Sequence, residues 1–127
     1  MQLIGVKIQQ VDVPNKNNHV YTRETIEQVI ADYDDSEKIL FGTIGMSNDR
    51  AIVHSSHRID KLRIEDGWLV GDVTVLETET GNALATMLEA HPLDFRMDGF
   101  CNIDLQDGKI VVTDYTLHRV NAVLDGA

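Results

Sequence analysis

The sequence contains a single cysteine, Cys101, and no apolar run near the roughly 20 residues that a membrane-spanning helix requires. One thiol excludes an internal disulfide and fits a reducing compartment. Residues 1–7 lack the basic stretch and the long apolar segment of a signal peptide. We therefore expect a protein made in a cytosol, with no membrane partner.

Basic residues are also scarce, because 21 Asp and Glu outnumber 11 Lys and Arg and give a formal net charge of −10. Such a surface repels phosphate backbones, which argues against a nucleic-acid partner. Two interpretations of the acidic surface stay open. It keeps the chain in solution, or it docks on a basic partner.

The remaining composition is that of a folded protein, with 43% hydrophobic and 25% charged residues in a chain of 127. This length is enough for one domain with a real core, over residues 1–127, and too short for two. The sequence shows no internal repeat, linker or low-complexity segment.

Hydrophobic periodicity predicts eight extended segments and two helices. The strands are expected over residues 3–11, 39–44, 51–53, 58–64, 68–76, 95–105, 109–113 and 115–123. One helix is expected over 22–33 with Thr22 as its N-cap, and another over 81–90. Asp66-Gly67 and Asp107-Gly108 predict tight hairpins. The sum is an α+β fold, a mostly antiparallel β-sheet or barrel with two helices.

The pattern of titratable residues indicates no active site, no metal and no cofactor. His54 and His57 lie three apart in a predicted strand or turn, where this spacing points them to opposite faces, and this argues against a shared metal ion. Glu77 and Glu79 could pair for acid–base chemistry, but a solvated approach to a helix is the favoured interpretation.

Nucleophilic catalysis needs a serine, cysteine or threonine beside a base. All the serines lie in the first half of the chain, at Ser36, Ser47, Ser55 and Ser56. Cys101 with His57 or His91 is the one thiol dyad available. A lone cysteine in an apolar strand is more typical of buried packing, and that is the expectation for Cys101.

Six short segments follow one another in a familiar order: NNHVY (17–21), FGTIGMS (41–47), SHRI (56–59), GWLVG (67–71), DFRMDG (94–99) and VNAV (120–123). Their order and spacing resemble the prohead core protease family of large tailed phages. Members of that family are serine proteases that cleave scaffold and capsid proteins, and their fold is related to that of the herpesvirus assembly proteases. The resemblance covers about residues 3–123 and implies a prohead-protease-like fold.

The same resemblance places the catalytic positions of the family on residues that cannot perform the reaction. The family histidine falls on Met46, the nucleophilic serine on Asp94, and the C-terminal acidic residue on Asn121. Methionine cannot accept a proton, and an asparagine cannot stabilise an imidazolium as a carboxylate does. Arg96 and Gly99 of the Ser-x-Arg-x-x-Gly segment are retained. The resemblance therefore implies a protein without catalytic residues.

We expect a non-catalytic phage-head structural protein, a capsid decoration or cement protein of the virion that is assembled in the host cytoplasm. Its partners would be the major capsid protein and neighbouring copies of itself on the capsid lattice, through exposed loops at residues 15–18 and 32–37. Three alternatives stay open. They are an active or atypical prohead protease, with His57 as base and Cys101 or Thr113 as nucleophile; a transient internal core or assembly protein; and a tail protein.

Overall fold

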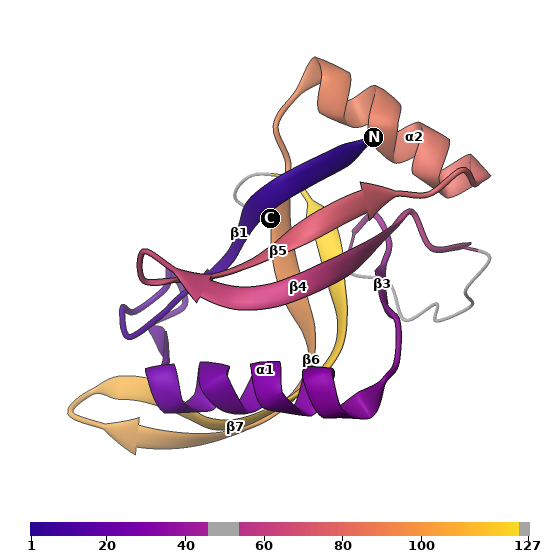
Figure 1. The fold of residues 1–127 in the computed structure, drawn as a ribbon. Helices are drawn as coiled ribbons and strands as arrows, with labels where there is room; N and C mark the ends of the chain where they lie inside the picture. Colours follow the sequence, from indigo (N-terminus) through magenta and orange to yellow (C-terminus); the bar gives the residue numbers. More distant parts are fainter. Residues whose placement is uncertain (46–53, 125–127) are drawn as a thin grey trace.

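The computed structural model describes residues 1–45 and 54–124, which form two β-sheets and two helices (Figure 1). The larger sheet has the order β1 (Gln2–Gln10), β5 (Trp68–Val75), β4 (His57–Glu65) and β3 (Leu40–Gly42). The smaller sheet has the order β2 (His19–Tyr21), β7 (Lys109–Val123) and β6 (Asp94–Gln106). The helices are α1 (Arg23–Ser36) and α2 (Glu79–Ala90). All pairings of named strands are antiparallel except that of β2 with β7, so the predicted α+β fold is confirmed.

Both predicted hairpins are present, and their backbone explains why the sequence signal was strong. Asp66 and Gly67 join β4 to β5 with φ angles of 51° and 80°, and Asp107 and Gly108 join β6 to β7 with 50° and 76°. Two consecutive left-handed residues define the turn that matches the twist of paired strands, and Asp-Gly adopts it at low cost.

Helix α1 starts where its cap was predicted. The Thr22 hydroxyl accepts a hydrogen bond from the backbone N–H of Thr25 (3.2 Å), which satisfies one of the otherwise unpaired N–H groups of the first turn. Ile26 and Val29 on the inner face are buried. The buried Thr25 hydroxyl donates to the carbonyl of Val112 (2.8 Å) and so ties the helix to β7.

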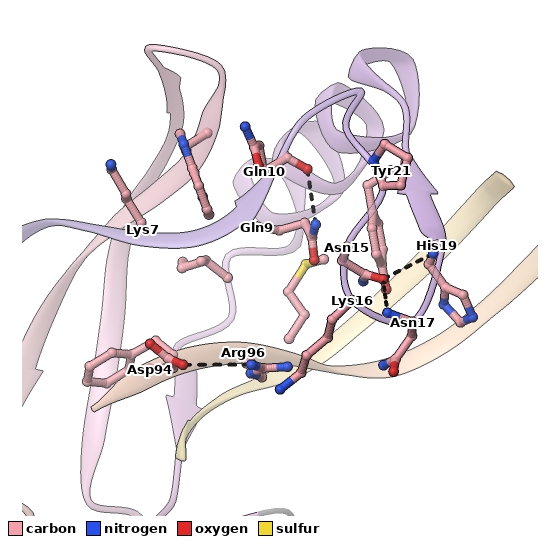
Figure 2. Close-up of a pocket in the computed structure, with 15 residues that line it drawn as sticks. Lys7, Gln9, Gln10, Asn15, Lys16, Asn17, His19, Tyr21, Asp94 and Arg96 are labelled. Carbon is pink, nitrogen blue, oxygen red and sulfur yellow. Dashed lines mark hydrogen bonds and ion pairs between the residues drawn. The ribbon is translucent and has the colours of Figure 1, made fainter. Parts of the chain in front are cut away.

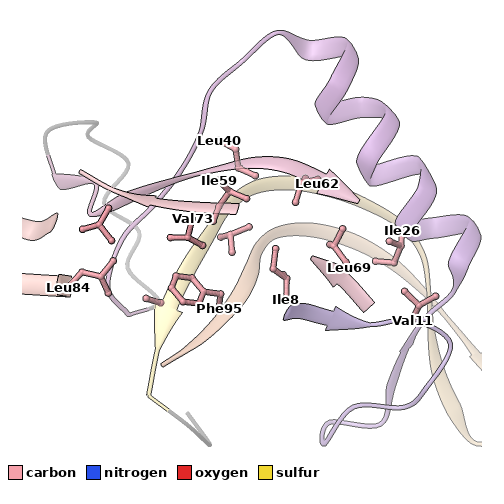
Figure 3. Packing of buried hydrophobic residues seen from close by; sticks show 13 residues of the cluster. Ile8, Val11, Ile26, Leu40, Ile59, Leu62, Leu69, Val73, Leu84 and Phe95 are labelled. Atoms are coloured by element: carbon pink, nitrogen blue, oxygen red, sulfur yellow. The ribbon is translucent and has the colours of Figure 1, made fainter. Parts of the chain in front are cut away.

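The core lies between the two sheets and is closed at its ends by the helices (Figure 3). Fully buried side chains come from both sheets, as with Ile59, Leu69, Val73 and Val120, and α2 adds Leu84. Burial of such side chains stabilises the fold by about 1.5–3 kcal/mol each. The two sheets therefore share one hydrophobic interior.

None of the helices in residues 1–45 and 54–124 is long and apolar enough to cross a membrane.

The β6–β7 ribbon is the longest pairing and extends past the core beneath α1 (Figure 1). Its register shifts twice, and each time the extra residue belongs to β7: His118 faces the step from Asp98 to Gly99, and Thr113 faces the step from Asn102 to Ile103. Bulges of this kind bend and twist the strand that carries them.

Several boundaries differ from the predictions. Strand β7 is continuous from Lys109 to Val123, so the predicted break at Asp114 is wrong, because a bulge and not a turn accommodates that region. The predicted acidic loop at 32–37 is the last turn of α1, with Glu37 as its C-cap. Helix α2 starts at Glu79, and Thr78 caps it. The strand predicted over 51–53 lies outside the described residues.

Candidate functional site

A groove of about 630 Å³ lies between β1, the segment that leads into α1, and the first residues of β6 (Figure 2). Strand β1 is an edge of the larger sheet and β6 is an edge of the smaller one, so the groove runs between two strand edges. Its walls combine amide, aromatic and charged side chains: Lys7, Gln9, Gln10, Asn15, Lys16, Asn17, His19, Tyr21, Trp68, Asp94, Phe95, Arg96 and Met97, with Ile8 and Pro14.

The groove is cationic on a protein that is otherwise acidic. Lys7, Lys16 and Arg96 line it together with one carboxylate, Asp94, whereas the whole chain carries a net charge of −10. The Lys7 ammonium stands 5.2 Å from the centre of the Trp68 ring, a distance at which the cation is attracted to the aromatic face. The groove therefore attracts anionic groups that the rest of the surface repels.

The turn that carries Lys16 is held by its own asparagines. The Asn15 side-chain oxygen accepts hydrogen bonds from the backbone N–H groups of Asn17 (2.9 Å) and His19 (3.0 Å). Asn18 adopts a left-handed conformation with φ 61°, and its amide donates to the Gly108 carbonyl at 2.9 Å. The Asn15 bonds hold the turn that forms one wall of the groove (Figure 2), and the Asn18 bond attaches this turn to the β6–β7 hairpin.

Asp94 and Asn121 lie close together on neighbouring strands. Asn121 is the register partner of Arg96, and Asp94 precedes Arg96 by two residues. Asp94 and Asn121 are therefore diagonal neighbours on one face of the ribbon, a separation of about 7–8 Å. Asn121 is fully buried, and its side-chain oxygen accepts a hydrogen bond from the Thr43 N–H (3.0 Å). Met46 lies outside the described residues, and Gly45, the last described residue before it, donates its N–H to the Ala122 carbonyl at 2.7 Å.

A serine and a histidine meet in the interior. The Ser56 hydroxyl lies 2.7 Å from Nδ1 of His57, and Nε2 of His57 lies 2.7 Å from the Val120 carbonyl. A carbonyl can only accept, so Nε2 carries the proton and Nδ1 accepts from the Ser56 hydroxyl. Both residues are completely buried, and burial lowers the pKa of His57 to about 4. His57 is thus a neutral ring that links β4 to β7.

Three-dimensional comparison finds a solved structure with a similar fold. The structure of the bacteriophage T4 capsid assembly protease, gp21, matches with a TM-score of 0.78 over 97% of this chain and 90% of that chain. The chain has a prohead-protease-like fold. The two sequences are 19% identical, a level at which the likeness concerns the fold. No protein-family model matches the sequence, and no curated protein matches it.

Within the prohead-protease-like fold, the position that the resemblance assigns to the nucleophile holds an ion-paired carboxylate. A carboxylate oxygen of Asp94 lies 3.7 Å from Nη2 of Arg96, and the Asp94 side chain is 45% exposed. Asp94 therefore faces the groove, within reach of a bound chain, without a hydroxyl or thiol to acylate. Position 99 requires glycine for steric reasons, because a Cβ there would stand 2.0 Å from the Thr116 carbonyl oxygen.

The remaining candidates are not brought together. Cys101 is exposed on β6, so the expectation that it is buried packing is wrong. His57 contacts Val120, whose register partner on β6 is Met97, four residues before Cys101, so Cys101 and His57 do not meet. Thr113 is also exposed, and its hydroxyl lies 3.3 Å from the Asn102 carbonyl. Glu79 opens α2 just after its cap. Among the described residues, no three His, Cys, Asp or Glu side chains gather as metal ligands.

Sequence reasoning missed the groove itself and the Ser56–His57 pair. The groove is built from three segments, residues 7–10, 14–21 and 94–97, whose approach depends on the packing of the two sheets. The pair had one sequence signal, the adjacency of Ser56 and His57, but adjacent residues of a strand point to opposite faces. Ser56 precedes the first residue of β4, and this position lets its hydroxyl turn back to the ring.

Proposed function

We propose that the chain is a non-catalytic structural protein of a phage head, a decoration or cement protein that uses a prohead-protease-like fold to bind the major capsid protein. The observation that carries the proposal is the chemistry of the groove. None of the described residues that line it is a serine, threonine or cysteine, and Asp94 occupies the position that the resemblance gives to the nucleophile. These lining residues can bind a chain but offer it no serine, threonine or cysteine to acylate.

The groove favours an extended segment of the capsid protein that carries carboxylates. Lys7, Lys16 and Arg96 supply three positive charges against the single carboxylate of Asp94. Tyr21 lines the groove and packs against the buried Tyr115 with ring centres 5.8 Å apart, and the exposed Asn17 adds an amide to the same site. A stable contact needs about 800 Å² per partner, so the rim of the groove must contribute as well.

Attachment to a lattice raises the effective strength of a modest contact. Each bound copy stands at a fixed place on a repeating surface, and contacts between neighbouring copies add avidity without a larger interface on the capsid protein. The acidic residues 32–37 lie at the C-terminal end of α1, whereas the groove-lining residues 14–21 lead into its N-terminal end, so the helix separates two surfaces of opposite charge. This division of charge suits a protein that touches two kinds of neighbour.

The first test is quantitative mass spectrometry of purified mature particles. Full-length chain at a constant simple ratio to the major capsid protein is the expected result. Its absence, or its presence only as fragments, would contradict a permanent structural role and favour a transient core protein or a protease.

The second test changes the charge of the groove. Purified heads that lack the chain are mixed with the wild type, with Lys16→Glu, or with Lys38→Glu, and co-sedimentation measures the bound fraction. Lys16 and Lys38 are both exposed, but only Lys16 lines the groove. We expect Lys16→Glu to weaken binding at least about tenfold, roughly 1.4 kcal/mol, and the matched control Lys38→Glu to bind as the wild type does. Equal binding of both variants would exclude the groove as the capsid-binding site.

An atypical hydrolase is the second candidate, and the Ser56–His57 contact of 2.7 Å is the observation that favours it. Both residues are fully buried, so a substrate reaches the hydroxyl only if the structure opens. An active-site-directed fluorophosphonate that labels the wild type and fails to label Ser56→Ala would establish this function. We expect no labelling, because the neutral ring and its hydroxyl are packed within the core.

A further inference from the structure

The two sheets have four edges, and three of them are poorly suited to pair with another chain. Strands β2 and β3 are three residues long. In the pairing of β1 with β5, the extra residues at both register shifts belong to β1. Gly5 and Ile8 fall in these shifts, and Gly5 has a φ of 66°. Short length and bulges on the edge strand are the usual means by which proteins prevent edge-to-edge association.

The fourth edge, β6, has neither protection. It has 13 residues, and both irregularities of its pairing place the extra residue on β7, so the backbone of β6 stays regular. The first residues of β6, Asp94 to Met97, line the groove beside β1. Residues 100–106 are all exposed, beyond the reach of β1 (Figure 1).

The free part of β6 also carries large apolar side chains. Phe100, Ile103 and Leu105 are 68%, 56% and 73% exposed. Ile103 is the register partner of Val112, which is buried against Val29 of α1, and paired residues of an antiparallel ladder share one face. Cys101, Ile103 and Leu105, at every second position, all lie on this face. The apolar layer beneath α1 therefore continues to the open edge of the sheet.

We propose that residues 100–106 of β6 form the surface through which a second copy of this chain binds, by antiparallel pairing about a twofold axis at Ile103. The two three-stranded sheets would join into one of six strands. This proposal rests on the proposed function in one respect only, which is that neighbouring copies of a head protein need a contact with each other. The pairing itself follows from the edge and requires no capsid.

The sequence of this edge is complementary to itself in that register. Ile103 stands opposite Ile103 of the second copy, Cys101 opposite Leu105, and Phe100 opposite Gln106. Asp104, the one charged residue among 100–106, stands opposite Asn102, whose amide can donate to a carboxylate. No two carboxylates face each other within the paired segment. By contrast, a twofold axis at Asp104 would place two carboxylates directly opposite, which is unfavourable.

Salt distinguishes this contact from binding in the groove. Each copy carries a net charge of −10, so two copies repel each other at long range, and added salt screens that repulsion. The paired strands contribute apolar side chains and backbone hydrogen bonds, which salt weakens little. Self-association should therefore strengthen with salt, whereas the attraction of the cationic groove for a carboxylate-bearing segment should weaken.

Sedimentation velocity on the purified chain, over a series of concentrations and without capsids, tests the proposal. We expect a reversible monomer–dimer equilibrium for the wild type. In Ile103→Lys, two ammonium groups face each other on the axis, and the dissociation constant should rise at least about tenfold. The matched control is Ile4→Lys on the edge strand β1, because Ile4 is likewise exposed (68%, against 56% for Ile103), and it should dimerise as the wild type does.

A thiol cross-link gives a second readout, because it traps a dimer that forms only transiently. In a Cys101→Ser background, Ile103→Cys should be joined to itself by a short bis-maleimide, and Ile4→Cys should not. A wild type that stays monomeric at every concentration and salt, or equal cross-linking at positions 4 and 103, would overturn the proposal. Capsid binding in the co-sedimentation test would remain unaffected by that failure, because it depends on the groove.

Discussion

The buried histidine at the junction of the two sheets makes stability depend on pH in a defined window. The His57 ring is fully buried, contacts the edge of Phe95 with ring centres 5.3 Å apart, and is held between Ser56 and Val120. Burial penalises the charged ring and lowers its pKa from 6.5 to about 4. Protonation would also place a second donor toward the Ser56 hydroxyl, which now donates to that nitrogen.

The size of the effect follows from the shift. The difference between 6.5 unfolded and about 4 folded, at 1.36 kcal/mol per pKa unit, corresponds to roughly 3 kcal/mol. In this window the unfolded chain binds a proton that the folded chain excludes. The contribution of a neutral His57 is therefore complete above about pH 6.5, and it is lost progressively as the pH falls toward 4.

Urea unfolding at several pH values between about 7.5 and 4 measures this loss, with His57→Gln as the test variant. The variant starts at lower stability because its side chain fills the site less well and bonds less completely. Its stability should nevertheless fall less with pH, by about the 3 kcal/mol assigned to His57. The exposed His91→Gln is the matched control and should follow the wild type.

A second buried group titrates in a separate range. The Gly5 N–H donates a hydrogen bond to the Asp72 carboxylate, and this bond lowers the pKa of Asp72 from 3.8. Arg63 lowers the same pKa further. The Asp72 contribution is therefore lost only as the pH falls below 3.8. If the wild type and His57→Gln lose stability equally between about pH 7.5 and 4, the assignment of the acid sensitivity to His57 is wrong.

Two further substitutions test the packing that positions these groups. In Gly42→Ala, the new Cβ would stand 1.7 Å from the Val120 carbonyl and 2.4 Å from Nε2 of His57. We expect a loss of about 3 kcal/mol or more in chemical denaturation, whereas Gly108→Ala, with open space around it, should cost about 1 kcal/mol from its positive φ alone. Thr22→Ala should lose about 1 kcal/mol because the α1 cap is removed, and Thr22→Ser should restore most of it; equal losses in the two variants would contradict the capping role.

The parts of the fold that could be predicted are those set by local chemistry. The Asp-Gly turns and the Thr22 cap depend on residues within four positions of each other, and the apolar face of α1 follows from its period. Strand β2 was missed because it has three residues, too few for a readable alternation. Its partner β7 lies some 90 residues further along the chain, so only the tertiary fold defines it.

Side-chain environment was harder to predict than secondary structure. Cys101 lies in an apolar alternation that would be buried in an inner strand, but β6 is an edge, and the same alternation faces solvent. His57 shows the reverse, because this polar side chain is buried: Gly42 leaves room for the ring to reach the Val120 carbonyl. Strand order within a sheet decides both cases, and periodicity does not reveal strand order.

One strand serves both proposed contacts, and this arrangement makes them separable. The groove uses Asp94 and Arg96 at the start of β6, and the pairing edge uses residues 100–106 beyond Gly99. Because the bulge at His118 separates the two halves in register, a charge at position 103 should leave the groove intact. On heads, Ile103→Lys should therefore bind single sites as the wild type does while losing the cooperative filling of the lattice. Lys16→Glu should show the reverse: weak binding at single sites and unchanged dimerisation in solution. If each variant impaired both properties equally, the two surfaces would be one, and the groove and the edge could not act independently.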